Sequence, residues 1–431
     1  MFKRIKKAVI CGSTLLFLLL SACSSPEGDN LKKLAIDGIK DIKPPEGCEI
    51  IEDIKDFKPV TADQSFNERT DMRTSVMFAD IAIAEDALYL NNSDLLIYYD
   101  KKTGNSNILC GKPDCEHISE ECNGCVFFSH NIQYYDGNLY SVINYYSLVR
   151  ISSDGVVRED LGKLNKSDVL SGGSIKWYIH RGYIYYWYTS GTSAGNNDTY
   201  YINGSNCIYR KALDKESEPE CIMALPIEEF SASHTFVGVG SYLYIIIDNA
   251  GIYRYNMESN KVEWFKELGN EIYGAAIFDN KIYYGHYDKD KKSTIIYSYD
   301  LKSNEKTVFL ETDKETWING FDEDFIYAGY EYSDNKWKTD VINRRGECIA
   351  VLPDWESAEV SELGEKHRMW SITDEDRIYI ISHMFLNSSD DNIYTPGISN
   401  GYTIIEFVDK EDILDGEYEV KDWSRILDEK Q

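Results

Sequence analysis

The pentapeptide Asp136-Gly137-Asn138-Leu139-Tyr140 joins a tight-turn signal to an aliphatic residue followed by tyrosine. The aliphatic–tyrosine pair occurs seven times, as Leu88-Tyr89, Leu139-Tyr140, Ile184-Tyr185, Leu243-Tyr244, Ile282-Tyr283, Ile326-Tyr327 and Ile378-Tyr379. Successive tyrosines of these pairs lie 51, 45, 59, 39, 44 and 52 residues apart. Self-similarity at such a period indicates a repeat architecture.

The chemistry of the pair predicts how the repeats pack. Adjacent side chains of a strand point to opposite faces, so Leu139 and Tyr140 require burial on both faces of their sheet. An Asp-Gly turn joins antiparallel strands. A lone four-stranded sheet cannot bury two faces, whereas sheets stacked radially in a closed ring can. The sequence therefore predicts an all-β fold, a β-propeller of seven blades, with six or eight as alternatives.

The composition agrees with a β fold and restricts the partners. Tyrosine, which suits a pleated surface, accounts for 33 of the 431 residues. The formal net charge of −28 repels phosphate backbones, so nucleic acid is not an expected partner. Surface acid also keeps an exported protein soluble, and we expect a monomer.

The first 22 residues carry an export signal. A basic start precedes an apolar run, Ala8 to Leu20, that is too short for a comfortable membrane span. The run ends in Leu20-Ser21-Ala22-Cys23, which resembles a bacterial lipobox. This resemblance implies cleavage before Cys23 and diacylglyceryl modification of its thiol, and acyl chains such as palmitate then anchor the chain. The expected location is the extracytoplasmic face of the cell membrane.

Three regions follow from these signals. Residues 1–22 are the lipoprotein signal peptide. Residues 23–73 are polar, with several prolines and no sustained period, and predict a flexible lipid-anchored tether. Residues 74–431 carry the repeats and form the predicted propeller.

A cluster of cysteines between the first two repeats is the stretch with the clearest chemical signal, because its residues can bind a metal or form disulfides. Its candidate ligands are Cys110, Cys115, His117, Cys122 and Cys125. Three thiolates and one imidazole within 13 residues can surround a tetrahedral zinc ion, and four protein ligands would make that site closed and structural. Disulfides are an alternative, because exported cysteines usually oxidise. Free buried or reactive thiols are a third.

Two further cysteines flank a predicted hairpin. Cys207 and Cys221 lie on either side of Asp214 and could form a disulfide across it. The alternative is that both are strand residues packed as small apolar groups.

The repeats resemble a known class of propeller. The Asp-Gly-x-Leu-Tyr and Ile-Tyr-x-Tyr-Asp units over about residues 75–423 resemble the YWTD-type propeller of the low-density lipoprotein receptor kind. They resemble more closely the uncharacterised propeller lipoproteins of clostridial, low-GC Gram-positive bacteria. The Cys-x-Lys-Pro-x-Cys-x-His segment that begins at Cys110 also resembles one in those lipoproteins. The family implies a scaffold for ligand binding rather than a reaction.

No phosphate-binding glycine loop occurs in the sequence, and its Gly-x-Ser-x-Gly match, Gly191 to Gly195, lies within the predicted β repeats rather than between a strand and a helix, as a nucleophile elbow does. We therefore expect a non-enzymatic binding module whose loop face engages a protein, peptide or glycan. One alternative is a cell-surface hydrolase or lyase that acts on glycans with acids at the propeller channel. Another is a zinc- or redox-responsive surface protein that uses the 110–125 loop.

Overall fold

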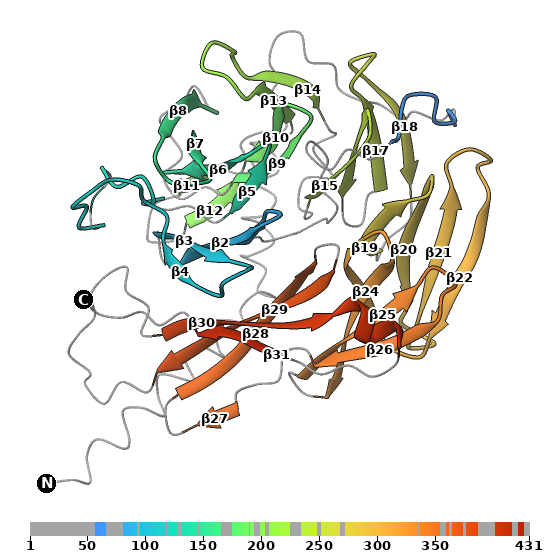
Figure 1. Ribbon diagram of the computed structural model, residues 1–431. Coiled ribbons are helices and arrows are strands. Elements are labelled where there is room, and N and C mark those ends of the chain that lie inside the picture. Colours follow the sequence, from blue (N-terminus) through green and yellow to red (C-terminus); the bar gives the residue numbers. More distant parts are fainter. Residues whose placement is uncertain are drawn as a thin grey trace, which may run out of the picture.

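The computed structural model describes residues 57–65 and, with internal gaps, residues 81–425; the longest gaps are 165–174, 225–233 and 387–400. The described strands form antiparallel sheets in chain order, arranged around a common centre (Figure 1). In the described parts, no helix is both long and apolar enough to cross a membrane. The predicted signal peptide, the lipidation residue Cys23 and the tether up to residue 56 lie outside the described residues.

The first three repeats each give a four-stranded sheet. Their strands are β1 (Ile81–Ile83), β2 (Ala87–Asn92), β3 (Leu95–Asp100) and β4 (Ser106–Ile108); β5 (Ile132–Tyr135), β6 (Asn138–Ile143), β7 (Ser147–Ser152) and β8 (Arg158–Lys163); and β9 (Ile175–His180), β10 (Tyr183–Tyr188), β13 (Cys207–Ala212) and β14 (Glu220–Ala224). A separate two-stranded hairpin, β11 (Ser190–Ser193) and β12 (Thr199–Ile202), is inserted into the third repeat.

The next three repeats also give four-stranded sheets. Their strands are β15 (His234–Val239), β16 (Tyr242–Ile247), β17 (Gly251–Asn256) and β18 (Lys261–Glu267); β19 (Ile272–Phe278), β20 (Lys281–Asp288), β21 (Ser293–Asp300) and β22 (Lys306–Thr312); and β23 (Thr316–Phe321), β24 (Phe325–Ser333), β25 (Lys336–Asn343) and β26 (Cys348–Pro353). We call these six sheets the first to sixth blades.

The final repeat forms a five-stranded sheet, which we call the last sheet. It contains β27 (Glu359–Ser361), β28 (Gly364–Thr373), β29 (Arg377–Leu386), β30 (Gly401–Asp409) and β31 (Lys421–Arg425), with the short helix α3 (Lys410–Leu414) after β30. The structure thus supports a β-propeller with six four-stranded blades, and the predicted count of seven is not supported as it stands. The extra strand β27 pairs with β28 through Glu359 and Lys366, so the last sheet departs from the pattern of the other six.

The aliphatic–tyrosine pairs explain why these sheets stack. Each pair lies on β2, β6, β10, β16, β20, β24 or β29, the strand that follows the tight turn of its repeat. Both members of every pair are buried, with no exposed fraction above 4%. The expectation that both faces of this strand are covered is therefore confirmed. Full burial of one such side chain contributes roughly 1.5–3 kcal/mol.

The turn that precedes Leu139-Tyr140 has the backbone that the sequence predicted. Asp136 and Gly137 have φ angles of 43° and 80°, the positive values of a two-residue hairpin turn. Tyr135 pairs with Asn138 directly across this turn.

Apolar clusters bridge each sheet to the next and hold the sheets together as a ring. One buried cluster joins the first two blades, others join the second to the third and the third to the fourth, and a large one spans the fourth to sixth. The last sheet contributes Ile378 and Val408 to a cluster with the sixth blade. It also contributes Tyr379 and Phe407 to a cluster with the first blade. The last sheet therefore packs between the sixth blade and the first.

The end of the segment predicted as a tether packs on the propeller. Residues 57–65, which we call the strap, lie beside β18 (Figure 1). The Tyr242 hydroxyl accepts hydrogen bonds from the Thr61 and Ala62 N–H groups, each at 2.9 Å. The Ser241 N–H donates to the Asp63 carbonyl at 2.7 Å, and the Val60 N–H donates to the Leu301 carbonyl at 3.3 Å. The strap therefore spans the fourth and fifth blades.

Candidate metal centre

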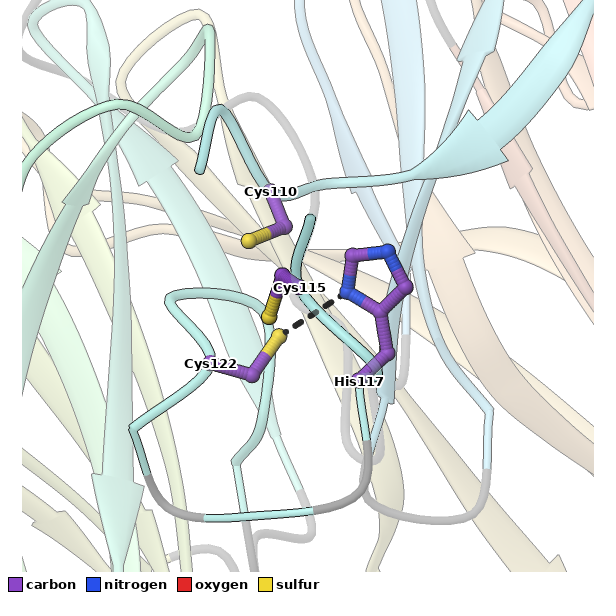
Figure 2. A group of neighbouring side chains, drawn as sticks. All are labelled: Cys110, Cys115, His117 and Cys122. Carbon is purple, nitrogen blue, oxygen red and sulfur yellow. Dashed lines mark hydrogen bonds between the residues drawn. The ribbon is translucent and has the colours of Figure 1, made fainter. Parts of the chain in front are cut away.

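Four of the five predicted cluster residues converge on one point in the connection between the first two blades. The ligating atoms of Cys110, Cys115, His117 and Cys122 all lie within 4.8 Å of one another. Figure 2 shows the three thiols and the edge of the imidazole facing a common centre. His117 Nδ1 is 3.3 Å from Cys122 Sγ. Among the described residues, this group is the one of metal-binding composition that the structure brings together.

Sharp backbone turns bring these side chains together. Cys110 follows β4, and the chain then reverses through Lys112 and Pro113. Asp114 and His117 both have a φ of 57°, in the left-handed region that residues other than glycine seldom adopt. These two turns place Cys115 and His117 beside Cys110. The Cys122 N–H donates to the Ser119 carbonyl at 3.0 Å, and this further turn brings Cys122 to the group.

Two polar side chains, one buried and one half-buried, fix the second half of the loop. Asn123 donates through Nδ2 to the carbonyls of Gly155 and Val156, at 2.9 and 2.8 Å. Arg158, at the start of β8, donates through Nη1 to the carbonyls of Cys122, at 2.9 Å, and Cys125. Both contacts reach the second blade, so the loop is held against the blade that follows it.

Close backbone contact requires glycine at three positions. A Cβ on Gly124 would lie 2.6 Å from the Leu109 carbonyl oxygen, and one on Gly111 would lie 2.6 Å from a Val156 methyl group. Gly155 has a φ of 70°, and its Cβ would lie within 3 Å of the backbone at Leu109. The loop and the turn between β7 and β8 therefore fit together without space for side chains.

Backbone N–H groups face two of the thiols. Burial alone would raise the pKa of Cys110, but hydrogen bonds from the N–H groups of Lys112 and Asn123 stabilise the thiolate, and the pKa is lowered. Burial raises the pKa of Cys122 well above its usual range, although the Gly124 N–H donates to its sulfur. Burial also raises the pKa of Cys125. Of these three thiols, Cys110 is the one whose ionisation the backbone N–H groups favour.

The donor set and the spacing fit a tetrahedral metal ion. Zinc binds thiolate sulfur at about 2.3 Å and imidazole nitrogen at about 2.0 Å, which separates a sulfur and a nitrogen ligand by about 3.5 Å. The 3.3 Å between His117 Nδ1 and Cys122 Sγ is close to that separation. Four ligating atoms within 4.8 Å of one another leave room for one ion at their centre.

Cys125 lies beside the group rather than in it. Its thiol is directed to the His117 carbonyl oxygen at 3.7 Å, and the side chain is 1% exposed. No disulfide joins the four cysteines of the loop in the structure. The sequence named five candidates, and the backbone path decides which four converge.

The predicted disulfide between Cys207 and Cys221 is not formed. Cys207, on β13, keeps a reduced thiol, whereas Cys221, on β14, is disulfide-bonded to a partner other than Cys207. The strand register explains this, since Cys207 lies opposite Ala224 and Cys221 lies opposite Tyr209. The Cα atoms of bridged cysteines usually lie about 4.4–6.8 Å apart, and residues that are directly opposite each other on paired strands meet this more easily than residues offset by two positions, as here.

The sequence did not reveal the residues that brace the loop. Asn123 could have been suspected, because it lies between two candidate ligands. No local signal marks Arg158, which is 36 positions after Cys122, the residue whose carbonyl it binds. Only the stacking of the second blade on the first brings Arg158 to the loop.

Comparison with known proteins finds solved structures of similar fold, including a β-propeller domain, but it does not assign the chain to a family. No protein-family model matches the chain, and no curated protein matches it. Among solved structures, the chain is similar to the β-propeller domain of Cps50 (Swd1) from Myceliophteria thermophila, with a TM-score of 0.41, 7% identity and coverage of 73% of this chain and 94% of that one.

Two other similar structures are those of a BamB protein and of a lyase. BamB from Moraxella catarrhalis has a TM-score of 0.37 and 11% identity, over 70% of this chain and 80% of that one. An oligogalacturonate lyase in complex with manganese has a TM-score of 0.39 and 10% identity, over 78% and 85%. At this level of similarity, the fold assignment rests on the sheets described above.

Proposed function

We propose that the chain is a lipid-anchored extracytoplasmic β-propeller that acts as a non-enzymatic binding module for a protein, peptide or glycan. The observation that carries the proposal is the order of its parts. A lipobox that ends in Cys23 precedes a polar segment and then a ring of sheets. Such an order suits a rigid surface held at a membrane by a lipid.

The strap suggests which end of the propeller ring faces the membrane. Its turn contacts are with Ser241, between β15 and β16, and Leu301, between β21 and β22. In antiparallel four-stranded sheets, the first and third turns lie at one end and the remaining connections lie at the other. The strap comes from the anchored side of the chain, so we place the ligand at the opposite end of the ring.

A seventh blade is part of the same proposal. The last sheet carries an aliphatic–tyrosine pair, Ile378-Tyr379, and packs against both the sixth blade and the first. Strands β28 to β31 correspond to the four strands of the other blades, and β27 is an addition to them. We therefore propose that the last sheet closes the ring as a seventh blade.

The anchor is tested first. Cys23→Ser in the full chain should move the protein from the membrane fraction to the soluble fraction and abolish labelling by a palmitate analogue. An unlabelled wild-type chain, or a variant that stays in the membrane, would remove the basis of the proposal.

Ligand binding is tested with the purified, unanchored chain. It should retain specific glycans on an array or specific proteins of the cell envelope, without changing them chemically. The alternative of a glycan hydrolase or lyase predicts turnover of a bound polysaccharide instead. Release of shortened glycans, lost when an acid at the channel is replaced by its amide, would establish that alternative.

A further inference from the structure

We propose that Cys110, Cys115, His117 through Nδ1, and Cys122 form a closed tetrahedral zinc site that fixes the connection between the first and second blades. This site is independent of the proposed ligand binding. It assigns a specific donor set, which excludes Cys125, and it assigns a structural role.

The donor chemistry selects the metal. Thiolates together with an imidazole in a tetrahedral set favour zinc over calcium, magnesium or manganese, which prefer oxygen ligands. The group of four contains no carboxylate. Four protein ligands leave no position for water or substrate, so the chemistry of this ion is structural rather than catalytic.

The surroundings of the sulfurs suit bound thiolates. The Lys112 N–H faces the Cys110 sulfur, and the Gly124 N–H faces the Cys122 sulfur, each two residues after the cysteine. Outer hydrogen bonds of this kind orient metal ligands and balance their charge. His117, which carries the imidazole, has a φ of 57°, in the left-handed region.

The first half of the loop is not held by burial. Gly111, Lys112, Pro113, Asp114 and Glu116 are all exposed, so this part of the loop has no apolar core of its own. Small structures that cannot bury enough apolar area gain stability from a bound metal or from disulfides. No disulfide joins the four loop cysteines in the structure, and a bound metal would supply the stabilising cross-link.

Metal content gives the first test. The full chain, purified without chelators and under reducing conditions, should contain one zinc per chain by mass spectrometry of its metals. Replacement of Cys110, Cys115, His117 or Cys122 by alanine should lower the zinc affinity, measured by competition with a chelator, by at least about tenfold, since changes in the outer shell alone cost 10–100-fold in affinity.

The matched control lies in the same loop. Cys125→Ser removes a buried thiol three residues from a ligand, and it should leave one zinc bound. Loss of zinc in Cys125→Ser with retention in His117→Ala would overturn the donor set in favour of four cysteines. A zinc-free wild-type chain that takes up no zinc when titrated would overturn the site altogether.

Two measurements on the unmodified chain keep the test valid if a variant fails to fold. Cobalt(II) in place of zinc should give the intense visible bands of a tetrahedral site and thiolate-to-cobalt charge-transfer bands in the near ultraviolet. Weak bands of octahedral cobalt would contradict the proposal. Mass spectrometry of the non-reduced protein should find no disulfide among the four loop cysteines. Disulfides among them would contradict the zinc site and would account for the cluster instead.

Discussion

Two segments outside the blades, the strap and the 110–125 loop, are attached to the propeller by different chemistry. The strap uses aromatic packing and hydrogen bonds to buried side chains of the fourth and fifth blades. The loop has an exposed first half and converges on three thiols and an imidazole. The difference teaches that a segment that packs on buried aromatic side chains can be held by burial, whereas the exposed half of the loop has no such packing.

Buried aromatic rings and a buried arginine contact the strap. Phe57 packs edge-on against Trp264 and Tyr299, with ring centroids 6.5 Å apart in both pairs. Arg254 is fully buried, lies over the Tyr242 and Trp264 rings, and donates through Nη2 to the Lys58 carbonyl at 2.7 Å. A buried guanidinium is stable only with such partners.

Removal of the proposed zinc should have the largest effect. Structural zinc contributes about 10–16 kcal/mol to the folding of small zinc-binding peptides, and we expect its loss here to cost at least about 5 kcal/mol of local stability. A chelator strong enough to remove the ion should make the chain sensitive to a glutamate-specific protease at Glu116 and Glu121. Peptide mapping would locate the cuts. Unchanged protection after the metal has been removed would show that the loop does not depend on it.

Trp264→Ala should have the second-largest effect, because it removes a fully buried side chain under the strap. Truncation of a buried tryptophan costs about 3–5 kcal/mol. Trp264 is 2% exposed and contacts both Phe57 and Arg254. Denaturant unfolding should show the loss, while zinc content stays at one per chain. A variant that also loses zinc would show that the two segments are coupled, against the comparison drawn above.

The two segments also differ in how far the sequence predicts them. The blades follow from a short-range pattern, and the pair Leu139-Tyr140 with its turn predicts strand, register and burial. The spacing from Cys110 to Cys125 likewise predicts the cluster, although not which four residues converge. That choice depends on the left-handed backbone at His117, which no sequence rule gives.

Local sequence patterns did not predict the packing of the strap or the fifth strand of the last sheet. The strap hydrogen bonds link residues about 180 positions apart, such as Thr61 and Tyr242, and its polar, proline-containing sequence predicts a tether. The pair Ile378-Tyr379 predicts a four-stranded repeat, but nothing in the repeat marks β27 as a fifth strand. Both features arise from packing between distant parts of the chain.

Phe57→Ala tests the strap alone and should have a smaller effect. Phe57 is half-buried, so we expect a loss of about 2 kcal/mol, roughly half the cost of truncating a fully buried ring. Hydrogen exchange should increase in residues 57–65 and leave the 110–125 loop unchanged. A matched exposed substitution, Lys102→Ala in the first blade, should change neither. Exchange that rises equally in the loop would contradict the independence of the two attachments.

The loop and the fourth blade should lose stability at opposite ends of the pH scale, and the alkaline loss is the smallest of the expected effects. Metal ligands must be deprotonated, so zinc should leave the loop as the pH falls. In the fourth blade, burial raises the pKa of Tyr255 from 10 to about 12, because the folded state favours the neutral phenol. Its contribution to stability is therefore fully present below pH 10 and is lost as the pH rises towards 12.

Tyr255→Phe isolates this alkaline contribution. The phenol also donates to Asn260 Oδ1 at 3.1 Å, so the variant should lose about 1 kcal/mol at every pH below 10. Above that, its unfolding free energy should fall less steeply than that of the wild type, by about 1–2 kcal/mol over the alkaline limb. Denaturant midpoints measured along a pH series would show the difference in slope. Parallel curves would mean that Tyr255 ionises as easily in the folded chain as in the unfolded one, and that the packing between the third and fourth blades is wetter than the burial of Tyr255 indicates.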